Sequence, residues 1–357
     1  MEEWLYGELL RVYYEARAGK RKTLDEQKFE LYRYEELKCL VREIITRTYH
    51  PSAGIAFIVT DPVQREIFAA PFRDRVIHHF LYNMVAKWWD KRLNYYSSSC
   101  RKGKGTLFAI RGLQKHMLNA SQNNTQRAYC IKFDLSGYFM SLPKDGLLAK
   151  VQWGLERQYP GMHNRWKREM LEFLWREVIY DKPTKGVKIR GKRSDWRGLP
   201  TNKSLFHQPE GNGIVIGNLT SQLLSNIYLD TLDRFITEEL KFPNYGRYVD
   251  DFYIVVSENE LSRALEAEDA IRVVLDGMRL RLNERKTKVQ EVRRGCEFVG
   301  GIVYPKSVIP NHRTKRNYLK VLRKAMVGEM EAERVVTYRG IYSHFCRAET
   351  EKKVWKI

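Results

Sequence analysis

The sequence has no uninterrupted apolar run long enough to span a bilayer. Its first residues, MEEWLYGELL, are acidic and lack the basic, apolar and small-residue order of a secretory signal. Cysteine is scarce: the five cysteines are an odd number, and no two stand at the spacing of a zinc knuckle. We therefore expect reduced core thiols rather than disulfides or a zinc site, in a cytoplasmic protein that does not enter a membrane.

Acidic residues are also in deficit. The chain has 63 Lys and Arg against 43 Asp and Glu, a formal net charge of +20. An excess of this size favours a polyanionic partner such as nucleic acid, with an anionic membrane surface or plain solubility as alternatives. Hydrophobic residues make up 43% of the 357 residues, so we expect a folded chain with a substantial core and two or three subdomains.

Apolar periodicity predicts several helices and strands, with no internal repeat. Helices are expected over 1–49, 75–92, 221–240 and 264–279, and basic helices over the last fifty residues. Strands are expected over 55–59 and 129–133, a strand pair over 298–304 and a hairpin over 245–256. This order suits an antiparallel sheet with helices packed on one face. The segment 181–203 reads as a basic loop, an expected RNA contact whose alternative is a solvated face.

Two adjacent carboxylates, Asp250 and Asp251, stand inside the apolar run GRYVDDFYIVV. An Asp-Asp pair is common in turns, so the dipeptide alone says little. A third acid, Asp134, ends the predicted strand 129–133. If the two strands pair, three carboxylates meet at one sheet edge, and such oxygen-rich clusters bind Mg²⁺. Two such ions would support phosphoryl transfer, so the sequence predicts a nucleotidyl transferase.

The residues that carry these acids resemble reverse transcriptases. YVDD (248–251) is similar to the family signature, and KFDLSGYF (132–139) is similar to the first catalytic strand. The resemblance implies an α+β right-hand polymerase with helical fingers, an antiparallel-sheet palm and a short helical thumb. It implies RNA-directed DNA synthesis with Asp134, Asp250 and Asp251 as catalytic residues, which hold two Mg²⁺ together with the Leu135 carbonyl. Phe139 stands where the family's aromatic excludes a 2′-hydroxyl, which implies dNTP substrates.

The segment GIVIGNLTSQLLSNIYLD (213–230) departs from most of that family. Ile216 replaces the usual Gln and Gln222 replaces the usual Pro. An Ile-Gly-Asn-x-x-Ser-Gln version is similar to the reverse transcriptases of diversity-generating retroelements, as are RDRVIHH (73–79) and RKGKGT (101–106). In those elements the departure accompanies misincorporation opposite template adenines, so we expect Ile216 to loosen nucleotide selection here. Gly217 would let backbone approach the new base pair.

Further matches extend the resemblance over about residues 60–304 in the family order. Arg65 matches the Arg that contacts the dNTP triphosphate, and Lys286 matches the Lys near the leaving pyrophosphate. FVGG (298–301) resembles the primer grip, which implicates Val299, Gly300 and Gly301. Charge adds a set of expected nucleic-acid contacts in two basic segments: Arg101, Lys102, Lys104, Lys188, Arg190, Lys192 and Arg193.

These matches suggest a division of the chain. We expect N-terminal helices and fingers over 1–128, a palm over 129–145 and 205–304, a helical segment with a basic insertion over 146–204, and a thumb over 305–357. Because 56 residues follow Gly301, we expect a short thumb and no RNase H, integrase or endonuclease domain. The resemblance therefore implies a bacterial or phage-encoded enzyme whose partners are template RNA, the RNA/cDNA duplex, dNTPs and a basic, oligomeric accessory variability protein.

Three other readings remain. A retron or group II intron enzyme would be another stand-alone bacterial reverse transcriptase, but Pro-Gln-Gly is absent at 215–217. A catalytically idle palm could serve as an RNA-binding scaffold, although all three acids are present. An RNA-dependent RNA polymerase would more often show Gly-Asp-Asp and lack an aromatic residue at 139.

Overall fold

The computed structural model describes residues 1–61, 63–328 and 332–345. They form two compact units, each assembled from separate stretches of sequence. Unit 1 comprises Met1–Leu93, Gly137–Thr231 and Met278–Leu280, and unit 2 comprises Asn94–Ser136, Leu232–Gly277 and Arg281–Ile357. The helix α9 (Leu219–Arg234) contains one boundary between them.

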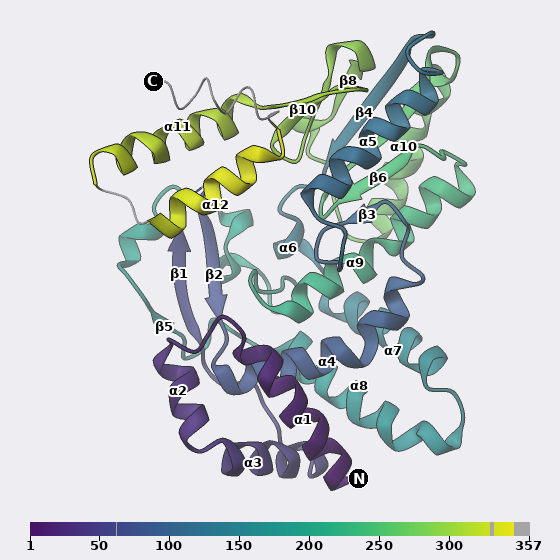
Figure 1. Ribbon diagram of the computed structural model, residues 1–357. Coiled ribbons are helices and arrows are strands. Elements are labelled where there is room, and N and C mark those ends of the chain that lie inside the picture. Colours follow the sequence, from purple (N-terminus) through teal and green to yellow (C-terminus); the bar gives the residue numbers. More distant parts are fainter. Residues whose placement is uncertain (62, 329–331, 346–357) are drawn as a thin grey trace. The chain divides into compact units, whose positions relative to one another are not determined.

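Unit 1 is mainly helical. Its helices are α1 (Glu2–Arg17), α2 (Leu24–Leu31), α3 (Arg33–Ile45), α4 (Phe72–Asp90), α6 (Tyr138–Ser141), α7 (Lys144–Gln158) and α8 (Arg165–Tyr180) (Figure 1). Short 3-10 turns lie at Met162–Asn164, Arg193–Trp196, Thr201–Lys203 and Leu205–His207. Close helix packing depends on small residues: a Cβ at Gly154 of α7 would lie 2.6 Å from the Trp89 ring of α4. The helices predicted over 1–49 and 75–92 are confirmed.

A small sheet completes unit 1. Strands β1 (Ile55–Val59) and β2 (Arg65–Ala69) form an antiparallel ribbon, and β5 (Lys188–Ile189) pairs with β1 in parallel. The basic loop at 181–203 is therefore not detached, because its middle adds a strand to this sheet. A core cluster that includes Phe68, Met140 and Leu205 packs beside the ribbon.

Unit 2 is built on a five-stranded sheet in the order β3-β6-β7-β4-β8. Its strands are β3 (Ser97–Ser98), β4 (Ala128–Asp134), β6 (Tyr245–Tyr248), β7 (Asp251–Ser257) and β8 (Lys288–Glu291). All neighbouring pairs are antiparallel except β3 with β6. The predicted strand 129–133 and hairpin 245–256 are confirmed, as is the α+β class.

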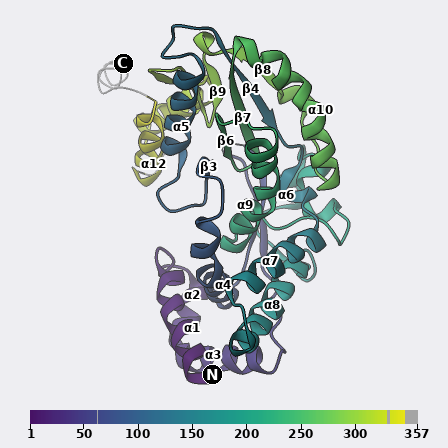
Figure 2. The ribbon, with the colours of Figure 1, turned by 90° about the vertical axis from the view of Figure 1, so that its right-hand side faces the viewer.

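Helices cover both faces of this sheet, so the expectation of helices on one face was wrong. Tyr253 and Val255 of β7 share a core cluster with α5 (Thr106–Ala120). Their neighbours Phe252, Ile254 and Val256 face the other way and are equally buried. Figure 2 shows α5 and α10 (Leu261–Gly277) on opposite sides of β4 and β7. The continuous apolar run of β7 is the signature of a strand that is buried on both faces.

The last part of unit 2 is a second antiparallel sheet followed by helices. Strands β9 (Cys296–Phe298), β10 (Gly301–Val303) and β11 (Val308–Pro310) precede α11 (His312–Met326) and α12 (Ala332–Ser343). Short turns lie at Glu258–Glu260, Glu284–Lys286 and Val292–Arg294, and α9 continues into the π-helix η5 (Phe235–Glu239). α11 and α12 are the helices expected in the last fifty residues, and residues 329–331 and 346–357 lie outside the described residues.

The cysteines are free but only partly in the core. Cys130 and Cys296 are buried with their sulfurs 3.0 Å apart, whereas Cys39 and Cys100 are exposed. The prediction of core thiols was therefore wrong for these two, because Cys39 lies on the outer side of α3 and Cys100 lies in a loop. Cys346 lies outside the described residues. Within the described ranges, no helix combines the length and the apolar character that a membrane span requires.

Candidate active site

Two of the predicted catalytic acids lie opposite each other on adjacent central strands of unit 2. The β4–β7 register pairs Asp134 with Asp251, the last residue of one strand with the first of the other. Directly opposed side chains on an antiparallel pair have Cβ atoms about 5 Å apart. Buried residues of the two strands hold this register, including the stacked rings of Phe133 and Phe252. The sheet edge thus brings two carboxylates together from distant parts of the sequence.

Cations and an amide surround this acid pair. The Lys286 Nζ lies 2.8 Å from one Asp134 oxygen, and the Asn283 amide donates to the other at 3.0 Å. The Lys132 Nζ lies 3.4 Å from Asp251 Oδ1. Partial burial acts to lower the pKa of Lys286, but the hydrogen bond to Asp134 and the charges of Asp134, Asp251 and Asp250 outweigh it and raise that pKa. An ammonium therefore lies in the combined field of all three predicted carboxylates.

Asp251 is the acid whose ionisation the fold opposes. Burial, with added repulsion from Asp250 and Asp134, raises its pKa to about 7, and the charge of Lys132 acts in the other direction. Its Oδ1 is buried without a hydrogen-bond partner. Carboxylates crowded in this way favour a bound proton or a hard cation. The donor set fits a divalent ion such as Mg²⁺.

The described residues nevertheless contain no group of three or more His, Cys, Asp or Glu side chains close enough to enclose a metal ion. Asp134 and Asp251 come together, while Asp250 acts on Asp251 through its charge from the hairpin turn. The backbone beside Asp134 is fixed by an isolated bridge between Leu135 and Leu282. Its hydrogen bonds use Ser136 N–H and Asp134 C=O, so the bridge does not engage the Leu135 carbonyl.

The turn that carries Asp250 has an unusual backbone. Tyr248 pairs with Asp251, so only Val249 and Asp250 form the loop, and Val249 has φ +58°. Left-handed conformations cost a β-branched residue about 1–2 kcal/mol, and glycine or asparagine is the usual choice in such loops. A compensating interaction must therefore come from elsewhere in the unit.

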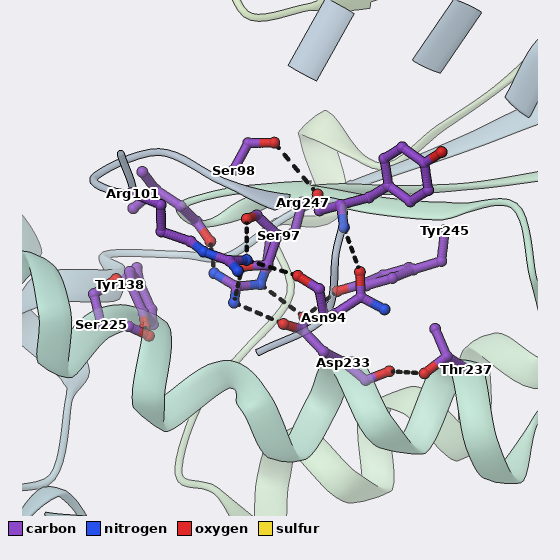
Figure 3. A network of polar contacts seen from close by, with 12 residues as sticks. Asn94, Ser97, Ser98, Arg101, Tyr138, Ser225, Asp233, Thr237, Tyr245 and Arg247 are labelled. Atoms are coloured by element: carbon purple, nitrogen blue, oxygen red, sulfur yellow. Dashed lines mark hydrogen bonds and ion pairs between the residues drawn. The ribbon is translucent and has the colours of Figure 1, made fainter. Parts of the chain in front are cut away.

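That interaction is a buried polar network centred on Arg247 (Figure 3). Its guanidinium donates to both Asp233 carboxylate oxygens, each at 2.7 Å, and to the Val249 carbonyl at 3.0 Å. A further bond reaches the Ser97 hydroxyl at 2.7 Å. Both charged side chains are fully buried. A hydrogen bond from a charged donor contributes about 1.5–3 kcal/mol, enough to offset the strain at Val249.

Tyr245 completes the network from the same strand. Its hydroxyl donates to Asp233 Oδ1 at 2.5 Å. Burial, followed by the negative charge of Asp233, raises the pKa of Tyr245 well above its usual value, so the phenol remains a donor. Asp233 therefore accepts from two residues of β6, and the end of α9 is tied to the strand that leads into the catalytic turn.

The predicted nucleotide-binding residues of unit 1 lie on neighbouring segments. Phe139 is in α6, and its carbonyl accepts from the Ile214 N–H at 3.0 Å. Ile216 packs against the cluster that contains Phe68 of β2, the strand that begins at Arg65. Gly217 has φ +121°, a conformation that requires glycine even though a Cβ would meet only ordinary contacts. Lys286, the remaining member of the set, belongs to unit 2.

The four basic residues predicted in the 181–203 loop are exposed: Lys188, Arg190, Lys192 and Arg193. The loop beneath them is anchored by Glu66 of β2, which is fully buried. Its carboxylate accepts from Trp196 Nε1 at 2.7 Å, the Ser204 hydroxyl at 2.7 Å and the Leu205 N–H at 2.6 Å. The fold therefore presents these cations on a fixed platform.

The basic residues near 101–104 differ in their surroundings. Arg101 Nη1 donates to the carbonyls of Asn94 and Ser97 at 2.7 and 2.8 Å. Lys104 donates to the Tyr95 carbonyl at 2.9 Å and lies over the Tyr95 ring. Lys102 is exposed at the tip of the loop. Arg101 and Lys104 thus stabilise the loop, and their role toward nucleic acid remains a prediction.

The predicted primer grip is a tight hairpin turn in unit 2. Phe298 pairs with Gly301, and the two loop residues Val299 and Gly300 have φ +47° and +84°. The Gly300 carbonyl accepts from the Thr314 hydroxyl at 2.7 Å, which joins the turn to the first residues of α11. A Cβ at Gly301 would lie 2.7 Å from the Phe345 ring. Glycine at 301 is therefore required by packing.

Comparison with known proteins gives this geometry its family. Residues 64–303 match the family model "Reverse transcriptase (RNA-dependent DNA polymerase)". The chain belongs to the reverse transcriptase family. The matched range contains the β4–β7 carboxylate pair, the Arg247 network and the segment around Ile216. The predicted enzyme class, RNA-directed DNA polymerase, is thereby confirmed.

Individual relatives are distant. The chain is 20% identical over 298 residues to Protein YkfC of Escherichia coli strain K12, covering 74% of this chain and 70% of that protein. Among solved structures, apo telomerase from Candida tropicalis aligns at a TM-score of 0.46 with 13% identity. Telomerase in complex with a TWJ fragment of telomeric RNA aligns at 0.45 with 14% identity. The alignments cover 81% and 79% of this chain but only 56% and 52% of the telomerase chains.

Sequence reasoning missed two buried charged groups, Glu66 and the Arg247–Asp233 pair. A signal was present in each case, because a charged residue stood within an apolar element. Arg247 directly precedes the Tyr-Val-Asp-Asp run, and Asp233 lies 14 residues earlier in the apolar helix. Burial of a charge requires a partner, but the sequence does not say which one.

Proposed function

We propose that this chain copies a template RNA into error-prone cDNA, with errors concentrated at template adenines, as the polymerase of a diversity-generating retroelement. The observation that carries the polymerase chemistry is that the β4–β7 register places Asp134 opposite Asp251, at the edge of the sheet where the charge of Asp250 also acts. Support for the finer class comes from Ile216 and Gln222, which stand where most of the family has Gln and Pro. A retron or group II intron enzyme is the competing class.

Asp134, Asp250, Asp251 and the Leu135 carbonyl are the proposed ligands of two Mg²⁺ ions. When bound, these ions would lower the pKa of the primer 3′-hydroxyl and stabilise the charge that develops on pyrophosphate. Lys286 has an exposed side chain, which would pair with a triphosphate oxygen as well as with Asp134. Arg65, exposed at the start of β2, would neutralise the same triphosphate.

The proposed nucleotide site selects the sugar and tolerates errors in the base. The Phe139 ring would exclude a 2′-hydroxyl, and Gly217 would allow backbone to lie against the new base pair. Ile216 is apolar and β-branched, so it cannot supply the hydrogen bonds of a Gln side chain. In this proposal Val299, Gly300 and Gly301 hold the primer end, while the exposed cations of the 181–203 loop contact the RNA.

Primer extension on an RNA template tests the chemistry. Wild type should incorporate dNTPs in the presence of Mg²⁺, and Asp250→Ala should lower the rate by at least about 100-fold because the metal site loses a ligand. Asp269→Ala, which removes an exposed acid from α10, is the matched control and should retain activity. If Asp250→Ala and the control extend the primer equally well, the assignment of Asp250 is refuted. If neither wild type nor the variants extend the primer, an RNA-binding scaffold is favoured.

Ile216→Gln tests the mutagenic class. A Gln side chain restores a polar contact beside the incoming nucleotide, so misincorporation opposite template adenine should fall by about 10-fold, a difference of about 1.4 kcal/mol in selection. Sequencing of the cDNA products measures this rate. Val273→Gln introduces the same side chain on an exposed face of α10 and should leave the error spectrum as it is. Equal error rates in Ile216→Gln and wild type would favour the competing class.

The partners and location follow from the same proposal. The enzyme would act in the cytoplasm of a bacterium, or of a phage-infected cell, on RNA bound together with a basic, oligomeric accessory protein. The proposed division is fingers over 1–128, palm over 129–145 and 205–304, an insertion over 146–204, and thumb over 305–357. Co-purification of template RNA with the accessory protein and this chain would test the assembly.

A further inference from the structure

We infer that Arg247 is a positioning residue for the turn that presents Asp250. Its guanidinium holds the Val249 carbonyl so that the two-residue loop keeps its left-handed conformation. This inference rests on the proposed role of Asp250 at the metal site. It assigns a task in the polymerase to a residue outside the predicted ligand and substrate contacts.

The guanidinium itself is fixed from two sides. Nε and Nη2 form a two-bond fork with Asp233, which projects from the end of α9. Nη2 also donates to the Ser97 hydroxyl in β3. Figure 3 shows these contacts converging on one side chain. The remaining nitrogen, Nη1, is thereby aimed at the Val249 carbonyl at 3.0 Å.

Fixing that carbonyl fixes the peptide that follows it. The peptide unit is planar, so the orientation of the Val249 carbonyl also sets the orientation of the Asp250 N–H and Cα. Val249 has φ +58° without the freedom of glycine, and extended backbone is its intrinsic preference. Without the Arg247 bond, the loop would sample other conformations and Asp250 would leave its position near Asp251.

The chemistry of the pair also favours positioning over bulk stability. A fully buried ion pair contributes little net stability compared with apolar residues of similar size. What the pair supplies is geometry, because a planar guanidinium donates in fixed directions. Lysine keeps the positive charge but cannot form the Asp233 fork and reach the Val249 carbonyl together. Arg247→Lys is therefore the informative change.

Hydrogen exchange of the turn gives a test that does not depend on activity. In Arg247→Lys, amide exchange in the peptide that spans residues 246–252 should be at least about 10-fold faster than in wild type. Ser97→Ala removes a bond from the same guanidinium without touching the turn, and is the matched control. Equal exchange in Arg247→Lys and wild type would overturn the inference whether or not the chain is a polymerase.

Kinetics and rescue test the functional consequence. Arg247→Lys should lower kcat by about 100-fold, change KM for dNTP by less than about 3-fold, and raise the Mg²⁺ concentration for half-maximal activity. Adding Val249→Gly supplies a residue that accepts the left-handed conformation, so it should recover at least about 10-fold of the lost kcat. A purely structural role for Arg247 predicts lowered thermal stability and no rescue by glycine, which would overturn the inference.

A neutral pair keeps the test usable if Arg247→Lys does not fold. Arg247→Gln combined with Asp233→Asn removes both charges, so neither remains buried alone. This double variant should also show fast exchange at 246–252, a lower kcat and recovery with Val249→Gly. If amide exchange at 246–252 in this double variant is as slow as in wild type, the inference is overturned. Equal primer extension by Asp250→Ala and wild type would instead count against the proposed polymerase site.

Discussion

At the scale of single residues, Asp251 shows how the fold prepares a site for cations. Its carboxylate is held by strand register beside Asp134 and near the charge of Asp250, in a half-buried position that opposes ionisation. Lys132 supplies only partial compensation, from 3.4 Å away. The residue is therefore placed at the expense of stability, as expected where a ligand completes the charge balance.

This placement gives a stability prediction for Asp251→Asn. The folded-state pKa of about 7 lies above the ordinary 3.8, so the folded protein binds this proton more tightly. The contribution of Asp251 to stability therefore falls as pH rises from about 4 to 7. In metal-free buffer at pH 8, Asp251→Asn should have a Tm at least about 2 °C above wild type, and the difference should vanish near pH 4.

Thermal melts at several pH values measure this effect, and the same melts with added Mg²⁺ give a second test. The ion should raise the Tm of wild type at pH 8 but leave Asp251→Asn unaffected, while primer extension by the variant is lost. Asp269→Asn, on an exposed part of α10, should match wild type at every pH. A variant melting below wild type at pH 8 would contradict the idea that Asp251 is strained by burial.

At the scale of elements, the basic loop at 181–203 is a prepared surface rather than a free segment. It adds β5 to the sheet of unit 1, and the Arg190 guanidinium lies 3.8 Å from the centroid of the Phe57 ring. Glu66 fixes its far end through Trp196. Pre-ordered cations lose little conformational entropy on binding, so this loop suits a polyanion that must be held in one register.

The loop therefore carries a salt-dependence prediction. Replacing Lys188, Arg190, Lys192 and Arg193 by Ser should reduce the slope of log K against log salt for single-stranded RNA by up to about 3, at roughly 0.7 per lost phosphate contact. Filter binding or fluorescence anisotropy between 50 and 300 mM salt would measure it. Neutralising Lys20, Arg21 and Lys22, also exposed in unit 1, should leave a steeper slope than the loop variant. Equal slopes would mean that only net charge matters.

The same scale shows what sequence could and could not provide. Strand β1 and the β6–β7 hairpin were predictable because apolar runs and turn residues are local signals. The unbroken apolar run from Phe252 to Val256 already indicated a strand buried on both faces. Helices on a single face are not compatible with that pattern. The parallel pairing of β5 with β1 joins residues far apart in the chain. Because β5 is only two residues long, it has no alternating apolar pattern from which a strand could be predicted.

The site was predictable to a similar limit. The acids were found because they interrupt or end apolar runs and because a known signature carries them, whereas Lys132 and Asn283 beside them were not singled out. Their contact with the acids depends on strand register and on a turn after α10, which no short sequence pattern specifies. The pairing of buried charges, such as Asp233 with Arg247, could not be predicted from the sequence and is seen only in the folded structure.

At the scale of the whole molecule, the net charge of +20 predicts stabilisation by polyanions. RNA that binds only the folded chain should raise Tm in proportion to the logarithm of its concentration, by about 4 °C at one hundred times Kd. Differential scanning fluorimetry at 50 mM salt measures this shift. It should disappear near 0.5 M salt, and uncharged dextran should not reproduce it. A shift that persists in high salt would point to recognition without charge neutralisation.

The register between β4 and β7 has a further consequence for how this chain can change over generations. Seven successive pairs, from Ala128 with Ser257 to Asp134 with Asp251, tie the acid pair to a run of buried core residues. Side chains on a strand alternate with a period of two, so one inserted or deleted residue would turn Asp134 to the opposite face and reverse the core behind it. Lineages of this enzyme should therefore drift by substitution in β4 and collect insertions only in the loops around it.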